Sequence, residues 1–355
     1  EVVPQTLHPL GYASPGSTLM ALARIAVAGT SGFIGAAVCE AFAKKAEVVA
    51  LTRSMARSGA AAGVRLHPCD HYSRKDLEAA LQGVDYAVYL IHNRDPSSRL
   101  DQARTRERDL LVGDNFGRAA ARAGVKQIVY RAQLLTEDAE HRTELEEVLA
   151  SHGVPVTVLR TTLVVGPGGE LTRLLVRMVR RLPVILLPKS ADIGIRPISL
   201  ADLLMALEHC VGNPASFGRE YPVLGPDAIT FRSLVGDTAA TLRRNPRILV
   251  LPGFSERQFA LMLRALYPSL HLEFIRYLLG TLASEINAQE NPIDGVLASH
   301  GVSFREALTA SVQAELARPS SAPQRTQDDA VIRNEARVRS IQRMSLPAGR
   351  NAAWM

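Results

Sequence analysis

The chain has 355 residues, of which 47% are apolar and 21% charged, and its formal net charge is +6. These values are typical of a packed globular protein, and they argue against wholesale disorder, a coiled-coil rod or a collagen-like repeat. The length fits one large domain or two ordinary ones.

Short apolar runs alternate with helical patterns from residue 24 to residue 165. The predicted strands are Ile25–Ala28, Glu47–Thr52, Val64–His67, Tyr86–Ile91, Ile128–Tyr130 and Val156–Leu159. The predicted helices are Ala36–Lys45, Ser73–Gln82 with Ser73 as N-cap, Leu100–Ala123 and Glu140–Ser151. Gly83, Gly124 and Gly153 follow three of these helices, as helix-ending glycines do. The alternation predicts an α/β protein with a Rossmann-type, doubly wound parallel sheet.

The pattern changes after Gly166-Pro167-Gly168-Gly169. Helices are predicted over Glu170–Arg181, Leu200–Cys210 and Phe231–Leu242, strands over Val184–Leu187 and near Tyr221–Leu224, and an apolar helical stretch over residues 255–283. With its lower strand content, this part predicts a smaller C-terminal cap region that closes a cleft over the carboxyl edge of the sheet, where ligands of such folds bind.

The two ends of the chain lack this regularity. Residues 1–19 form either a short extension packed on the body or upstream sequence, with Met20 as the natural start. Ala317–Arg325 predicts a linker, and the chain ends just after Trp354, which suggests a truncated further domain. The expected division is 1–20 extension, 21–165 core, 166–316 cap region interleaved with the core, and 317–355 linker and truncated domain.

The positive charge is concentrated near the end of the chain. Residues 318–355 hold seven arginines and three acidic residues, residues 1–23 contribute one negative charge, and residues 24–317 therefore carry +3. An excess in a tail is not a basic face, so we expect no nucleic-acid partner.

Cysteine spacing and hydropathy bear on metals and membranes. Cys39, Cys69 and Cys210 form no CxxC pair and no zinc-ligand cluster, so we expect no metal and a reducing, cytoplasmic location. The most apolar stretch, Leu182–Leu187, is far shorter than the 18 or so residues of a membrane span.

One glycine-rich segment carries the chemistry. The sequence Gly29-Thr30-Ser31-Gly32-Phe33-Ile34-Gly35 lies between a predicted strand and a predicted helix. In this context Gly29 allows a tight turn, Gly32 lets the backbone approach a pyrophosphate, and Gly35 lets the helix pack closely. The amides at the helix start then face phosphate oxygens. A plain glycine-rich turn is the alternative.

The end of the second strand indicates which dinucleotide is preferred. A carboxylate at this point binds the ribose hydroxyls of NAD, whereas this chain has Leu51-Thr52-Arg53-Ser54. Arg53 can pair with a 2′-phosphate, so NADP is favoured over NAD. A solvated surface arginine is the alternative.

These residues resemble a known family. The resemblance rests on Gly29–Gly35, Arg53, Asp70, Tyr89–His92, Gly124–Tyr130, Gly153–Arg160, Arg196–Ile198, Asp202 and Leu224–Asp227. The chain is similar to atypical short-chain dehydrogenases/reductases, in the NAD(P)H-binding branch near the NmrA-like proteins and the accessory subunit of respiratory complex I. The match covers about residues 21–315, and Val338–Trp354 resembles the start of an extra domain that bacterial members carry.

The resemblance implies specific contacts with the dinucleotide. Thr30, Ser31, Phe33 and Ile34 would lie along the pyrophosphate, Asp70 and His71 near the adenine, and Leu90, Ile91 and His92 beside the adenine ribose. The segment Tyr130–Leu134, which includes Arg131, would run under the nicotinamide.

The chain departs from the family at its catalytic pair. By the family spacing, the tyrosine position falls on Asp138 and the lysine position on Arg142. Arg142 can hold the ribose as a cation, but its pKa is too high for proton relay. His92, His141 and Tyr130 are alternative acids, although a strand-end cap, an exposed helix residue and sheet packing also explain them.

The sequence therefore predicts an NADP(H)-binding protein that reduces an unknown small carbonyl or quinone-type compound. The alternative is a non-catalytic dinucleotide sensor or assembly subunit of NmrA-like type, because the Tyr-x-x-x-Lys pair is absent. A membrane-associated accessory role would rest on the apolar stretch 259–282, but its charged residues favour core or partner packing. The substrate and a protein partner or homo-oligomer stay open.

Overall fold

The structure is a computed structural model that describes residues 23–53, 63–91, 99–134, 139–268, 270, 272–283 and 303–317; the side chains of residues 99–105, 139–142, 272–273 and 283 lie outside this description. The chain forms two compact units, residues 1–315 and 316–355. All described elements belong to the first unit, apart from the last two residues of the final helix.

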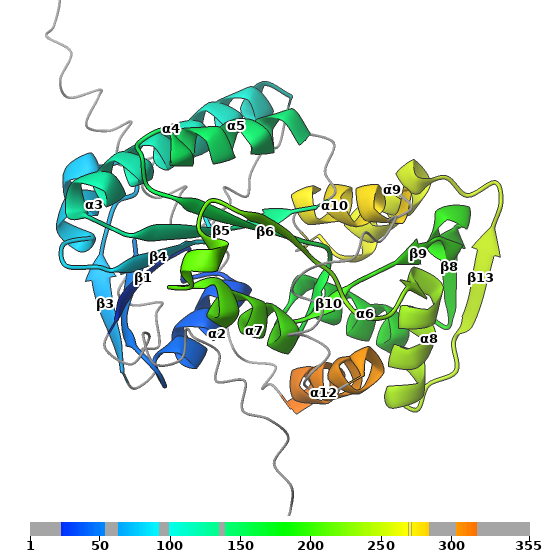
Figure 1. Cartoon of the computed structure of the whole chain (residues 1–355). Coiled ribbons are helices and arrows are strands. Elements are labelled where there is room, and N and C mark those ends of the chain that lie inside the picture. Colours follow the sequence, from blue (N-terminus) through cyan, green and yellow to red (C-terminus); the bar gives the residue numbers. More distant parts are fainter. Residues whose placement is uncertain are drawn as a thin grey trace, which may run out of the picture. The chain divides into compact units, whose positions relative to one another are not determined.

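Seven parallel strands form the central sheet of the first unit (Figure 1). The strands are β1 Arg24–Ala28, β2 Glu47–Thr52, β3 Val64–Pro68, β4 Tyr86–Tyr89, β5 Gln127–Gln133, β6 Val156–Thr161 and β11 Glu220–Val223. Their order, β11-β6-β5-β4-β1-β2-β3, reverses between β1 and β4. This is the doubly wound order, and it confirms the predicted Rossmann-type α/β fold.

Helices cover both faces of this sheet (Figure 1). The helices α2 Phe33–Phe42 and α7 Leu200–Cys210 pack on one face, and α3 Arg74–Ala80, α4 Arg99–Ala123 and α5 Ala139–Ala150 on the other. The inner strands are buried on both sides, which is why β1, β2 and β4 are almost continuously apolar. Because the strands are parallel, their carboxyl ends all lie along one edge of the sheet.

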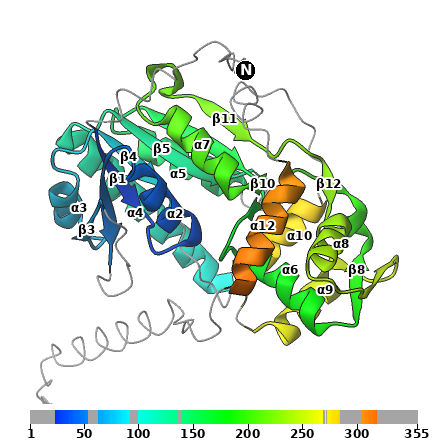
Figure 2. The same cartoon turned by 90° about the horizontal axis from the view of Figure 1, so that it is seen from below.

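A third hydrophobic cluster, besides those on the two faces of the sheet, lies outside the central sheet. It is built by α6 Glu170–Arg181, α8 Phe231–Thr241, α9 Glu256–Leu266, α10 Leu272–Ala283 and α12 Phe304–Ala317. The short strands are β7 Val164–Val165, β8 Val184–Pro188, β9 Gly194–Ile195, β10 Ile198–Ser199, β12 Ile229–Thr230 and β13 Arg247–Leu251, which form three two-stranded sheets. In the turned view, α12 lies beside α8 (Figure 2), where Arg305 Nη2 is 3.1 Å from Asp237 Oδ1.

The predicted elements need several corrections. The helix after the glycine turn begins at Phe33 and ends at Phe42, three residues earlier at each end than expected. Strand β5 continues past Tyr130 to Gln133. The stretch 255–283 is two helices, because Pro268 cannot continue α9. The strand β13 and the helix α12 were not predicted.

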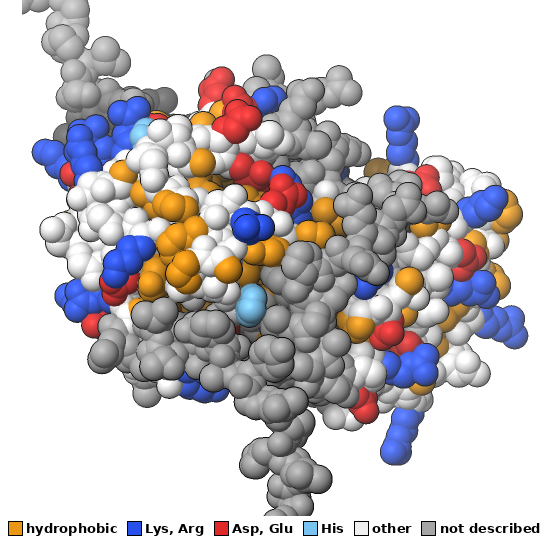
Figure 3. Space-filling model, in the orientation of Figure 1, with side chains coloured by type: hydrophobic (Ala, Val, Ile, Leu, Met, Phe, Trp, Pro, Cys, Tyr) orange, Lys and Arg blue, Asp and Glu red, His pale blue; other side chains and the backbone are white. Residues whose placement is uncertain are grey.

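Charge and hydropathy vary along the described surface. Figure 3 shows basic and acidic side chains interspersed over the face seen in Figure 1. None of the helices in the described part of the chain combines the length and the apolar content needed to cross a bilayer.

Candidate functional site

The turn between β1 and α2 depends on two of its glycines for steric reasons. Gly29 has φ +92°, and a β-carbon there would lie 2.7 Å from the carbonyl oxygen of Leu90. A β-carbon on Gly35 would overlap the carbonyl oxygen of Gly29. Any larger residue would force β1, β4 and α2 apart, so the fold itself requires these two glycines.

Gly32 differs from its two neighbours. Its φ is −81°, which any residue can adopt, and a β-carbon would meet only the carbonyl oxygen of Gly29 at 3.4 Å, an ordinary contact. Gly32 is the N-cap of α2 and provides no side-chain cap for the first amides of this helix. The packing therefore does not explain this glycine, whereas a ligand phosphate approaching those amides would.

Most side chains between the glycines make contacts within the protein. The Thr30 hydroxyl donates to the carbonyl oxygen of Leu51 at 3.1 Å, and Ile34 packs on the core beneath α2. The ring of Phe33 lies against the Gly166–Gly169 loop, since a β-carbon on Gly166 would be 2.7 Å from it. Only Ser31 has an exposed side chain. What these residues offer a pyrophosphate is therefore mainly backbone amides.

The carboxyl ends of β2 and β3 bring Arg53, Asp70 and His71 to the same edge. The amide of Cys69 donates to the carbonyl oxygen of Thr52 at 2.9 Å, so the segments that follow the two strands start side by side. Arg53 is exposed. Asp70 makes a local hydrogen bond, in which its Oδ1 accepts from the amide of Tyr72 at 3.1 Å.

His71 is the unusual member of this group. It is 8% exposed, and its Nδ1 has no hydrogen-bond partner among the described residues. Burial, and then the positive charge of Arg53, lower the pKa of His71 to about 4. The ring is therefore neutral at pH 7, and the edge carries the charge of Arg53 without a second cation.

The end of β4 lies directly against the glycine turn. The Leu90 amide donates to the carbonyl oxygen of Ala28 at 2.9 Å, and its own carbonyl faces Gly29. Leu90 and Ile91 thus adjoin the turn at the point where the strand order reverses. His92, the third residue predicted here, lies outside the described residues.

The two residues predicted on β5 have different surroundings. Tyr130 is 1% exposed and stacks edge-to-face on Tyr89, with ring centroids 5.8 Å apart. This is the packing role that the sequence also allowed, and it does not favour Tyr130 as an acid. Arg131 is also buried, but its Nε donates to the Thr161 hydroxyl at 2.7 Å, near the carboxyl end of β6.

A tyrosine that the sequence analysis missed reaches the same place. Tyr277, on α10, donates its hydroxyl to the carbonyl oxygen of Thr161 at 3.1 Å. The amide of Leu134 donates to the same oxygen at 2.8 Å. Tyr277 and Arg131 therefore converge on Thr161, beside the segment predicted to run under the nicotinamide. The one local hint was a hydroxyl within an apolar helix, which needs a partner when buried.

The remaining catalytic candidates lie at the start of α5. His141 and Arg142 are in its first turn, where the side chains lie outside the described residues, as does Asp138. The helix itself is anchored further along, because Arg160 on β6 makes a two-point contact with Glu146 at 3.0 and 2.8 Å. Among the described residues, no three His, Cys, Asp or Glu side chains gather as a metal site would require.

Sequence comparisons found relatives of this chain. Residues 22–152 match the NmrA-like family. A (4-alkanoyl-5-oxo-2,5-dihydrofuran-3-yl)methyl phosphate reductase of Streptomyces griseus is 30% identical over 262 residues, which are 69% of this chain and 82% of that protein. The auxiliary protein GraX of Staphylococcus aureus is 28% identical over 134 residues, 38% of this chain, and the match spans only 42% of GraX.

Solved structures share the fold. An NADPH-dependent quinone oxidoreductase of Escherichia coli, in complex with NADPH, has a TM-score of 0.64 at 21% identity, over 81% of this chain and 99% of that one. The triphenylmethane reductase of a Citrobacter species, in complex with NADP(H), has a TM-score of 0.62 at 17% identity, with the same coverage of both chains.

Proposed function

The chain belongs to the NmrA-like family of atypical short-chain dehydrogenases/reductases, and from this premise we propose that it binds NADP(H) and reduces a small carbonyl or quinone-type compound. The observation that carries the proposal is Gly32, a glycine that the packing does not require, at the uncapped start of α2. The named activities of the relatives, reduction with NADPH among them, support the same cofactor and reaction type.

The residues present fit the dinucleotide. In this proposal the amides of the Gly29–Gly35 turn bind the pyrophosphate, and Arg53 binds the 2′-phosphate near Asp70 and His71. Leu90, Ile91 and His92 flank the adenine ribose, and Arg131 and Arg142 lie on the nicotinamide side. The dinucleotide, when bound, supplies the hydride. The core 21–165 would then hold the cofactor and the region 166–316 the substrate.

The proton must come from a residue other than the missing family tyrosine. We assign it to the hydroxyl of Tyr277, which lies with Arg131 at Thr161, at the edge where the nicotinamide would lie. In this proposal the hydroxyl leaves the Thr161 carbonyl, gives its proton to the substrate oxygen that gains the hydride's electron pair, and regains a proton from water. The rival donor is His141, in the first turn of α5.

The cysteines support a reducing, cytoplasmic setting. Cys39, Cys69 and Cys210 are buried free thiols, and burial, joined at Cys69 by nearby carboxylates, raises the pKa of each to about 12. Such thiols stay protonated and are structural rather than reactive.

A non-catalytic dinucleotide sensor is the second candidate, and the specific observation in its favour is Asp138 and Arg142 at the catalytic positions. Titration of the protein with NADPH and NADH, followed by the absorbance of reduced cofactor against quinones, aldehydes and enones, separates the two. Turnover of any of these compounds supports the enzyme. Binding without turnover favours the sensor, and binding of neither nucleotide contradicts both.

Cofactor preference is tested at Arg53. Arg53→Glu replaces a cation by an anion beside the predicted 2′-phosphate, so we expect the Kd for NADPH to rise at least tenfold more than that for NADH. Fluorescence titration of both reduced nucleotides measures the ratio. An equal loss of both affinities would contradict the assignment of the 2′-phosphate to Arg53.

A further inference from the structure

The edge strand β3 presents basic side chains to the face of the sheet on which α3 packs. Its register places Arg65 beside Val49 and His67 beside Leu51. Val49 and Leu51 belong to the hydrophobic cluster beneath α3, whereas Val64 and Leu66 of β3 pack on the opposite face. Two basic residues thus occupy positions at which the neighbouring strand has apolar ones.

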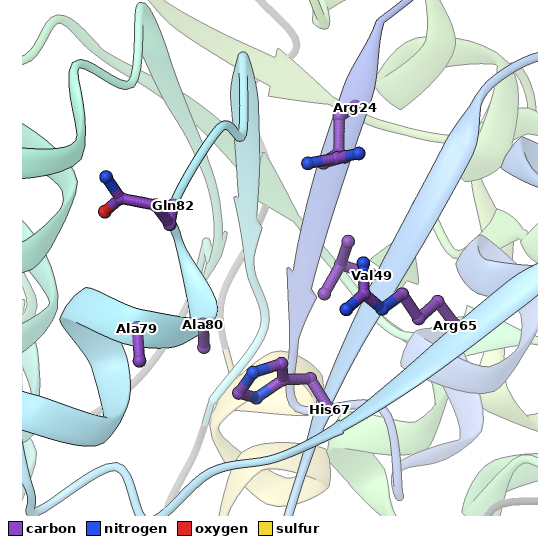
Figure 4. A pocket seen from close by; sticks show the side chains of 7 residues that line it. All are labelled: Arg24, Val49, Arg65, His67, Ala79, Ala80 and Gln82. Atoms are coloured by element: carbon purple, nitrogen blue, oxygen red, sulfur yellow. The ribbon is translucent and has the colours of Figure 1, made fainter.

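A cavity of about 240 Å³, here called the α3 pocket, lies between this face and the end of α3. It is lined by Arg24, Val49, Arg65, His67, Ala79, Ala80 and Gln82. Figure 4 shows the Arg24 and Arg65 side chains and the His67 ring on the strand side of this space, and Ala79 and Ala80 on the helix side, with the Gln82 amide directed away from the strands. The volume is below the roughly 300–1,000 Å³ of pockets for drug-sized molecules, so a ligand would be small.

The charge of the α3 pocket is positive. No carboxylate lines it, although Glu47 Oε1 lies 3.0 Å from Arg24 Nε and offsets part of that charge. Arg65 forms no ion pair with any described residue. Figure 3 also shows Lys and Arg side chains gathered over the end of the molecule where α3 lies. An anion entering the pocket would therefore meet Arg65 without a paired carboxylate among the described residues, whereas at Arg24 it would compete with Glu47.

His67 supplies a polar group beside the cations. Its Nδ1 lies 2.9 Å from the carbonyl oxygen of Pro68, which can only accept, so Nδ1 carries the hydrogen. The Nε2 lone pair is then left to accept a hydroxyl. This chemistry fits a ligand with hydroxyl groups next to its anionic group.

We infer that the α3 pocket binds a small hydroxylated phosphomonoester, with the phosphate on Arg65 and Arg24 and a hydroxyl on His67. Arginine suits this role because its planar fork donates two parallel hydrogen bonds to phosphate. The pocket is separate from the dinucleotide site, because Arg24 begins β1 and Arg65 lies early in β3, away from the carboxyl ends. The competing explanation is that the exposed Arg65 and the half-buried His67 merely protect an edge strand from pairing with another strand, which requires no ligand.

Calorimetric titration with inorganic phosphate and glycerol 3-phosphate, at an ionic strength held constant with chloride, tests the inference. We expect saturable one-site binding, tighter for glycerol 3-phosphate. Arg65→Ala should weaken it at least tenfold, because a charge-assisted hydrogen-bond pair is lost. Arg257→Ala, which removes one exposed charge on α9, should leave it unchanged.

Phosphate bound in the glycine turn would also give saturable binding. The same titrations are therefore carried out on Gly32→Ala, which alters the turn and not the α3 pocket. Retained phosphate binding in Gly32→Ala, with unchanged thermal unfolding and NADPH affinity of Arg65→Ala, supports the α3 pocket. Three outcomes overturn it: no saturable binding, equal binding by Arg65→Ala and wild type, or binding lost only in Gly32→Ala. None of them depends on whether the protein proves to be a reductase.

Discussion

At the scale of single residues, the three glycines of the turn have different roles in our proposal. Gly29 and Gly35 are required for folding, whereas Gly32 is required for ligand binding. Gly32→Ala adds a methyl group that the protein accommodates, at 3.4 Å from the nearest carbonyl oxygen, but that stands in the path of a phosphate. We expect the Kd for NADPH to rise at least tenfold, because hydrogen bonds to charged groups contribute about 1.5–3 kcal/mol. The thermal midpoint should change little, since the folded protein has room for the added methyl group. Fluorescence titration and thermal unfolding measure the two effects.

Two other glycine-to-alanine variants serve as controls for Gly32→Ala. Gly35→Ala should fail to fold, since its β-carbon would overlap the carbonyl oxygen of Gly29. Gly236→Ala, in α8, meets no atom within 4 Å and should stabilise the protein by about 0.5–1 kcal/mol without changing NADPH affinity. If Gly32→Ala bound NADPH as tightly as wild type, the turn would not be the pyrophosphate site.

Tyr277 is the residue on which the chemical step depends in our proposal. Tyr277→Phe removes a hydroxyl that donates to Thr161 and keeps the ring, so we expect kcat to fall about 10²-fold or more, with the Kd for NADPH within twofold. The alkaline limb of the pH profile of kcat should also change, which a merely structural hydroxyl would not produce. Steady-state kinetics across pH measure both.

Tyr267→Phe is the control for this substitution, since the Tyr267 hydroxyl is buried without a partner among the described residues. It should leave kcat unchanged. A loss of kcat in His141→Asn but not in Tyr277→Phe would move the proton donor to α5.

At the scale of elements, local patterns predicted the sheet because each strand and helix of the core follows its own periodicity. The start of α2 was placed too late because all three glycines were assigned to the turn. Gly35 instead lies within the first helical turn, where close contact with Gly29 excludes a side chain.

The elements that were missed have two different causes. The capping box of α12 was present in the sequence, since the amide of Glu306 donates to Ser303 Oγ and the Glu306 carboxylate accepts the Ser303 amide. Strand β13 had no comparable local signal, because the strand with which it pairs among the described residues, β8, is about 60 residues earlier. Tyr277 could not be placed for the same reason: its contact with Thr161 spans 116 residues and is decided by packing.

At the scale of the whole molecule, His71 links the stability of the fold to pH. Its folded-state pKa of about 4 lies below the ordinary value of 6.5, so the folded protein favours the neutral ring. The contribution is present above about pH 6.5 and is lost as the pH falls toward 4, because the unfolded chain takes up the proton first. The lowered pKa of His71 therefore contributes at most about 3 kcal/mol to the free energy of unfolding.

We therefore expect the free energy of unfolding to decrease between pH 6.5 and pH 4, and His71→Leu to make this decrease shallower. Urea unfolding at several pH values measures both slopes, and the difference between them cancels the other titrating groups. Parallel slopes for wild type and His71→Leu would show that folding does not lower the pKa of His71. In that case the folded protein would protonate His71 near its ordinary pKa of 6.5. The β2–β3 edge would then carry a second positive charge beside Arg53 only below that pH, and NADPH affinity would rise as the pH falls through 6.5.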